Sequence, residues 1–108
     1  MNISNFRGSS ESFHLIQTTG RTQTASISLQ SGEATSDEMN SHPHSDQTVV
    51  LLDGELVAEV GGERTVLRSG ESLIIPAGVK HRLRNEAKST AFAFTVYAPP
   101  AYQTDDPT

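Results

Sequence analysis

The chain has 108 residues, a length that suits one domain with a single hydrophobic core. Its net charge of -5 and the lack of any Lys/Arg block argue against a nucleic-acid-binding surface, because acidic excess repels phosphates. It has no cysteine, so disulfides and thiolate metal ligands are excluded, and a metal would have to bind nitrogen and oxygen. The N-terminus lacks the apolar segment of a signal peptide, and no run approaches the ~20 apolar residues of a membrane span. We therefore expect a soluble cytoplasmic protein with no membrane partner.

The first part of the chain predicts strands with polar connections. Residues 1–11 are polar and Ser-rich, which predicts an N-terminal arm or an edge strand. A strand pair is expected within 12–31, where three apolar residues share one face, namely Ala25, Ile27 and Leu29. The polar segment 32–41 follows as a loop, and its place before the first histidine pair makes it a candidate rim or lid.

The second part predicts further strands at short spacing. Residues 47–53 are apolar on both faces, so this strand needs a second layer over its outer face. A partner subunit could supply that layer, which predicts a homodimer. Gly-rich turns separate the remaining expected strands, which are 55–60, 63–68, 72–76, 81–85 and 90–97. The pattern predicts an all-β sandwich or barrel over 12–100, followed by a frayed polar tail at 101–108.

Three of the four histidines gather in two stretches of the chain. His42 and His44 are two residues apart, so on an extended strand both imidazoles project from the same face and can converge on one ion. His81 follows a Pro-Ala-Gly turn and alternates with its neighbours so that it shares the inward face with Leu83. Whether the three imidazoles meet depends on the fold.

These residues carry a resemblance to the cupin superfamily. The second cupin motif is met at every position, by Gly70, Pro76, Gly78, His81 and Asn85. The first motif is met by Gly32, His42, His44 and Gly54, with two departures: more residues separate Gly32 from His42 than the family pattern has, and Gln47 stands where many cupins have Glu. From the residues alone, Asn85 is expected to cap a turn at a strand end.

The resemblance implies a small single-domain cupin, an all-β double-stranded β-helix of jelly-roll topology with a divalent metal at its mouth. The implied metal ligands are His42, His44, Gln47 and His81. Such ligands suit Fe, Mn, Zn or Ni and do not identify the ion. Because Gln47 is neutral, the metal charge would stay uncompensated and favour an anionic ligand. The alternative for Gln47 is an inward-pointing residue that does not touch metal.

Two main functions follow from this resemblance. One is a metal-dependent, dioxygenase-type enzyme acting on a small anionic or enol-like organic substrate. Its catalytic residues are not identified, and four candidates for a general base are unranked: Glu33, Asp37, Glu38 and Tyr97. The alternative is a non-catalytic module that binds or senses a metal or small ligand, without nucleic acid, since no helix-turn-helix is present. A barrel without metal is a third possibility if Gln47 marks a decayed site.

Overall fold

Eight antiparallel strands and one short helix make up residues 1–103, the part of the chain that the computed structural model describes. The 3-10 helix η1 spans Phe6–Gly8. The strands are β1 (Phe13–Thr18), β2 (Gln23–Leu29), β3 (Asp46–Asp53), β4 (Glu55–Val60), β5 (Glu63–Arg68), β6 (Ser72–Ile75), β7 (His81–Arg84) and β8 (Ala91–Ala98). No helix long and apolar enough to cross a membrane occurs in this part of the chain.

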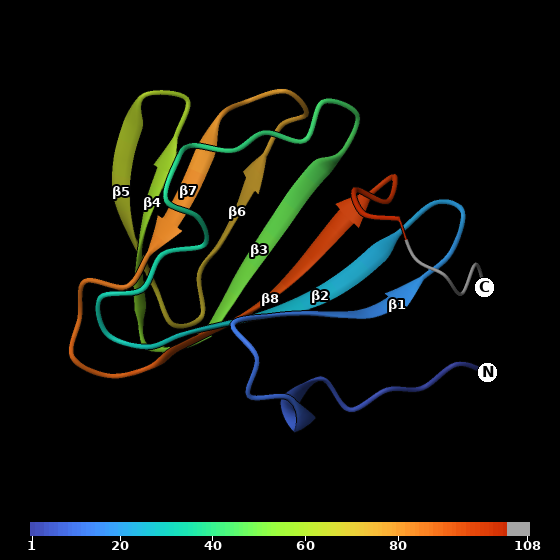
Figure 1. Ribbon diagram of the computed structural model, residues 1–108, viewed down its shortest axis with the longest axis horizontal. Helices are drawn as coiled ribbons and strands as arrows, with labels where there is room; N and C mark the ends of the chain where they lie inside the picture. The colour runs from blue at the N-terminus through green and yellow to red at the C-terminus, as the bar shows by residue number, and fades with distance from the viewer. Residues whose placement is uncertain (104–108) are drawn as a thin grey trace.

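The strands form two sheets that enclose one core. The five-stranded sheet has the order β1-β2-β8-β3-β6, and the three-stranded sheet has the order β5-β4-β7 (Figure 1). Chain neighbours such as β3 and β4 lie in different sheets, whereas β8 pairs with β2 and β3, which precede it by many residues. The predicted all-β jelly-roll architecture, a double-stranded β-helix, is confirmed.

The core forms between the inward faces of the two sheets. In β2 the predicted inward residues Ala25, Ile27 and Leu29 are all buried, and Ser26 on the opposite face is buried as well. Inward residues of both sheets pack into one apolar cluster, whose buried members are Ile27, Leu29, Val49, Leu51, Leu56, Ala58, Leu67, Ile75, Leu83, Ala91 and Ala93. Alternating side chains with one buried face are what a two-layer β fold requires.

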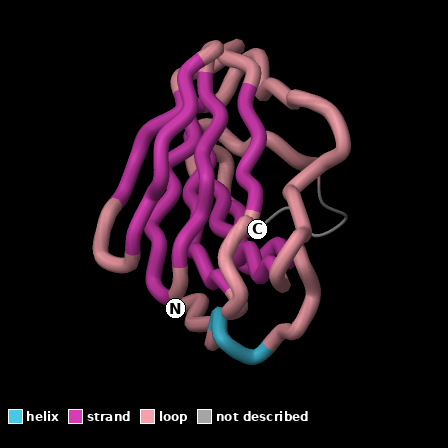
Figure 2. Tube along the Cα trace, turned by 90° about the vertical axis from the view of Figure 1, so that its left-hand side faces the viewer, coloured by secondary structure: helices cyan, strands magenta, loops and turns pink. Residues whose placement is uncertain are grey.

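Part of the outer face of the five-stranded sheet is covered by the N-terminal segment. Phe6 of η1 packs on Phe92 and Phe94 of β8, with ring centroids 6.1 and 5.0 Å apart. Arg7 lies over the Phe92 ring and forms an ion pair with Asp53 at 2.9 Å. In Figure 2 this helix lies at one end of the strands. The chain itself therefore supplies some of the second layer that the sequence suggested a partner would provide.

Polar inward-facing residues collect at one end of the barrel. Gln47, near the start of β3, is paired in register with Tyr97, near the end of β8, and Tyr97 is also paired with Gln23 at the start of β2. His81 begins β7 in the other sheet. Because the apolar core residues lie further along the same strands, the barrel has one polar end, and the candidate site lies there.

Candidate functional site

A cavity of about 230 Å³ opens at the polar end of the barrel. Both sheets, the loop before β3 and the segment after β8 contribute to it. Its lining residues are Ser12, Phe13, Ile27, Leu29, Ala34, Thr35, Ser36, Asn40, His42, Gln47, His81, Leu83, Tyr97 and Tyr102. The cavity thus combines an apolar floor, aromatic walls and a few polar groups, which is the usual composition of a small-molecule site.

Two imidazoles meet in this cavity. His42 and His81 have ring centroids 5.2 Å apart. The Nδ1 atom of His81 lies 3.1 Å from the carbonyl oxygen of Val79, which can only accept, so Nδ1 carries the proton and Nε2 is left as an acceptor in the neutral ring. Burial lowers the pKa of His42 below its ordinary value of 6.5, and the neighbouring His81 lowers it further.

His44 does not join them. The expectation that His42 and His44 lie together on one extended strand was wrong. Strand β3 begins only at Asp46, and residues 43–44 form a turn. Pro43 has no N–H to donate to a strand ladder, and Asp46 accepts a hydrogen bond from the Ala77 N–H at 2.9 Å as the strand starts. His44 is exposed and lies outside the cavity.

Asn40 and His42 are also two residues apart, and it is these two residues that share one face. Asn40 forms an antiparallel bridge with His81, in which its N–H donates to the His81 carbonyl at 2.9 Å and its carbonyl accepts from the His81 N–H at 2.7 Å. Residues paired in this way point to the same face, and a residue two further on does so too. Asn40, His42 and His81 therefore all line the cavity.

Gln47 is buried in the cavity wall, with 3% of its surface exposed. Its Nε2 donates to Thr95 Oγ1 at 3.0 Å and to Tyr97 Oη at 3.2 Å. The Thr95 hydroxyl proton is already donated to the Thr48 carbonyl, so Thr95 Oγ1 must accept, and the amide nitrogen rather than the oxygen faces it. Gln47 Oε1 is consequently a buried acceptor without a hydrogen-bond partner among the residues that the structure describes.

Two tyrosines form the aromatic side of the cavity. The Tyr97 and Tyr102 ring centroids lie 5.4 Å apart, and each also lies close to His42, at 5.1 and 5.5 Å respectively. Burial, and then the neighbouring Tyr102, raise the pKa of Tyr97 far above its ordinary value of 10.0. Tyr97 therefore stays protonated, and of the four predicted candidates for a general base it is the one that lines the cavity.

The three acidic candidates lie elsewhere. Glu33 and Asp37 line a shallow polar groove beside Arg82 and Arg84, and Glu38 lines neither this groove nor the cavity. Glu33 Oε1 accepts a hydrogen bond from the Gln30 N–H at 2.7 Å, which closes the turn after β2. These carboxylates thus belong to the loop's exterior.

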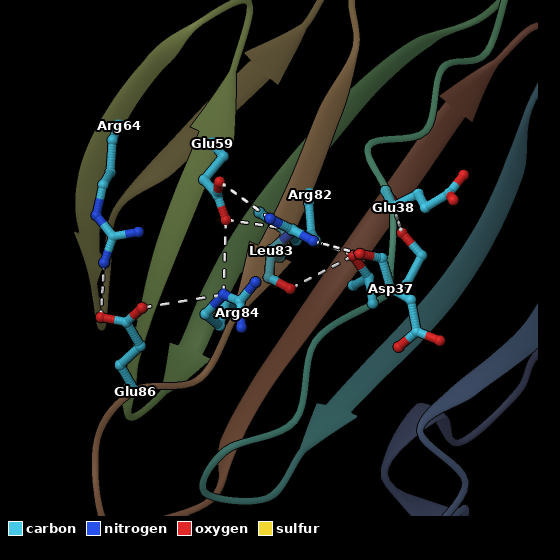
Figure 3. Close-up of polar contacts among 10 residues, drawn as sticks. Asp37, Glu38, Glu59, Arg64, Arg82, Leu83, Arg84 and Glu86 are labelled. Carbon is cyan, nitrogen blue, oxygen red and sulfur yellow. Dashed lines mark hydrogen bonds and ion pairs between the residues drawn. The ribbon is translucent and has the colours of Figure 1, made fainter.

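The loop before β3 is held against β7 and forms the cavity rim. The Thr35 N–H donates to the Leu83 carbonyl at 2.9 Å, and the Leu83 N–H donates to Thr35 Oγ1 at 3.1 Å. Arg82 binds both carboxylate oxygens of Glu59, at 3.2 and 3.3 Å, and donates to the Asp37 carbonyl (Figure 3). The Arg82 hydrogen bond lowers the pKa of Glu59. These contacts fasten the loop that carries Asn40.

The sequence interpretation missed Asn40 and Tyr102. Asn40 stands two residues before His42, a spacing that could have identified it once the strand between His42 and His44 was questioned. Tyr102 is an isolated aromatic residue in a tail expected to be frayed, and no local pattern identifies it. Ala101 and Tyr102 are half-buried and hydrogen-bonded to Gln23, so this part of the tail is ordered, while the rest of the tail, 104–108, lies outside the described residues.

Three of the four predicted metal ligands line the cavity, namely His42, Gln47 and His81, and His44 does not. Within residues 1–103, no three or more His, Cys, Asp or Glu side chains are grouped so that they could hold a metal ion. His42 and His81 are the two imidazoles present, and Asn40 and Gln47 add neutral amides. Metal centres in proteins take at least three strong ligands, with charged ones common. The metal centre therefore stays a prediction.

Comparison with known proteins agrees with the barrel fold. The family model described as a cupin domain, Cupin_2, matches residues 25–97. The crystal structure of TT1209 from Thermus thermophilus superposes with a TM-score of 0.81 and 28% identity, covering 92% of this chain and 98% of that chain.

Two curated relatives match part of the chain. The tetracenomycin polyketide synthase protein TcmJ of Streptomyces glaucescens is 35% identical over 65 residues, 60% of this chain and 42% of the relative. The uncharacterized protein YdbB of Bacillus subtilis is 39% identical over 49 residues, 44% of this chain and 43% of the relative. The chain thus spans less than half the length of these relatives. Because the family model covers most of the chain, the protein belongs to the Cupin_2 family of cupin domains.

Proposed function

We propose that this cupin binds a compact, planar organic molecule that donates a hydrogen bond from a hydroxyl group, as a phenol or an enol does. The observation that carries the proposal is the unpartnered Gln47 Oε1, a buried acceptor in the cavity wall. A buried acceptor without a partner costs about 1–3 kcal/mol, which a ligand hydroxyl would recover on binding. An anion that carries no proton cannot donate this hydrogen bond and would not recover the cost.

The rest of the cavity suits the same class of ligand. The rings of Tyr97 and Tyr102 meet at an interplanar angle of 80°, so a planar ligand can stack on one while it meets the edge of the other. With Nδ1 directed at the Val79 carbonyl, the His81 ring in its neutral form would offer Nε2 as a second acceptor. The cavity volume of about 230 Å³ is smaller than the roughly 300–1,000 Å³ typical of sites for drug-sized ligands. We therefore expect a small ligand rather than an extended one.

The relatives give limited further support. The name of TcmJ, a tetracenomycin polyketide synthase protein, agrees with a ligand that carries carbonyl or enol oxygens, because polyketide chains contain such groups. The dioxygenase-type reaction implied by the family resemblance needs a metal-ligand set other than the one that faces the cavity, and it stays a prediction.

The test is an NMR titration of the full isotope-labelled chain with phenol and with anisole, which has the same ring but no hydroxyl proton. We expect phenol to shift the resonances of His42, His81 and Gln47, and to bind about tenfold more tightly than anisole. Binding should persist in the presence of a chelator. Equal affinities for phenol and anisole, or no shifts with either, would contradict the proposal.

A pair of histidine variants separates this proposal from the metal centre. His42→Ala removes a cavity residue, whereas His44→Ala removes an exposed side chain outside the cavity. Phenol binding should weaken in the first variant and stay unchanged in the second. If both variants lose binding, together with a transition metal present in the wild-type protein, the predicted four-ligand centre is the better description.

A further inference from the structure

The C-terminal segment is fastened to the barrel by one buried glutamine. Gln23, at the start of β2, is fully buried and uses both ends of its amide. Its Oε1 accepts from the N–H groups of Ala101 and Tyr102, at 3.2 and 3.0 Å. Its Nε2 donates to the Tyr102 carbonyl at 2.9 Å and to Thr18 Oγ1 at 3.0 Å. Tyr102 is thus held through both its backbone N–H and its carbonyl.

This anchoring brings the Tyr102 ring over the cavity. The ring lies 5.0 Å from Phe13 on β1, 5.5 Å from His42 and 5.4 Å from Tyr97, measured between centroids. Three separate parts of the fold therefore meet at this one ring. Because Tyr102 lines the cavity and lies on a connecting segment rather than in a strand, it closes a side that the strands leave open.

We propose that Tyr102, held by Gln23, is the residue that sets the size of the ligand and aligns its ring beside His42. The proposal rests on the proposed function, since it concerns the same ligand and the same cavity. Removing the ring would open the cavity toward β1 and admit a second aromatic ring beyond the first. Removing the Tyr102 hydroxyl alone would leave the wall in place.

The experiment compares the affinities of phenol and 4-phenylphenol for the wild-type chain, Tyr102→Ala and Tyr102→Phe. We expect Tyr102→Ala to raise the affinity for 4-phenylphenol relative to phenol by about tenfold or more, and Tyr102→Phe to keep the wild-type ratio. A general loss of stability would weaken both probes together and leave their ratio unchanged. The ratio therefore distinguishes a specificity role from a structural one.

A second variant tests the anchor without altering a cavity residue. Gln23→Glu keeps the side-chain shape but removes the amide donor to Tyr102, so we expect its affinity ratio to move in the same direction as that of Tyr102→Ala. If the wild type binds phenol and the ratio is unchanged in Tyr102→Ala, the role of Tyr102 is overturned while the proposed function stands. If the wild type binds neither probe, both proposals are overturned.

Discussion

Replacing Gln47 with glutamate tests the role of its amide, because the two side chains have nearly the same shape. The carboxylate lacks the two N–H donors that meet Thr95 Oγ1 and Tyr97 Oη. At about 1 kcal/mol for each lost hydrogen bond, the variant should lose about 2 kcal/mol of stability. In a domain of this size that loss lowers Tm by roughly 10 °C. A charge buried in the cavity wall adds to the loss.

The loss should depend on pH. Burial raises the pKa of the introduced carboxyl above its unfolded value of about 4.3. Between the unfolded and folded pKa values, the folded state keeps a proton that the unfolded state has released, so the free energy of unfolding falls as pH rises through this window. We therefore expect Gln47→Glu to be less stable at about pH 8 than at about pH 5, relative to the wild type at each pH.

Urea unfolding followed by circular dichroism, on chelator-treated protein, measures both effects. Gln103→Glu is the matched control, because it makes the same chemical change at an exposed position. If Gln47→Glu is as stable as the wild type at both pH values, the two hydrogen bonds donated by the Gln47 amide do not contribute as argued. A variant that copurifies with stoichiometric metal and melts above the wild type would instead support the metal centre predicted from the sequence.

Three further predictions follow from other parts of the molecule. Gly54 and Gly62 both have positive φ, but a Cβ at Gly54 would lie 2.8 Å from the Thr90 carbonyl oxygen, whereas a Cβ at Gly62 would meet no atom of the described residues within 4 Å. Gly62→Ala should cost about 1 kcal/mol and Gly54→Ala clearly more, and equal losses in urea unfolding would contradict this. The free energy of unfolding should fall as pH drops below 6.5, because the unfolded state binds a proton that half-buried His42 resists. His42→Gln should flatten this dependence, and an unchanged pH dependence in urea unfolding would contradict the assignment. The homodimer stays a prediction. Ile74 is 64% exposed on the edge strand β6, so Ile74→Glu should dissociate the dimer. If the wild-type protein sediments as a monomer at micromolar concentration, the prediction is contradicted.

Strand positions could be predicted because burial imposes a period of two on the residues. In β2 and β7 the predicted inward residues, such as Ile27 and Leu83, are buried, since a one-residue slip would bring polar neighbours into the core. Asn85 caps the turn after β7 as expected, accepting from the Ala87 N–H at 2.9 Å. Helix η1 was not predicted, because three residues carry no periodicity and its packing on Phe92 depends on the tertiary fold.

The site was harder to predict because irregular segments build much of it. His81 could be assigned, since it lies on a strand after a turn at Gly78, which has a φ of 81°. The partner of His42 was misassigned, because alternation was assumed through Pro43 although the chain turns there. Tyr102 is brought to the cavity by Gln23, and a contact between residues so far apart in sequence leaves no local pattern.

Three buried amide side chains allow structural and functional roles to be compared within one molecule. Gln23 and Asn85 are fully buried, and both have partners for the oxygen and the nitrogen of the amide. Gln47 is almost as deeply buried, yet its nitrogen is paired and its oxygen is not. In an amide side chain that only joins strands, we expect both the oxygen and the nitrogen to have hydrogen-bond partners, as in Gln23 and Asn85. Thr24 Oγ1 and Ser26 Oγ on β2 are also buried without a partner among the described residues, but neither residue lines the cavity. Gln47 differs from these hydroxyls and from the two paired amides in lining the cavity, which is why we propose it, and not them, as a ligand contact.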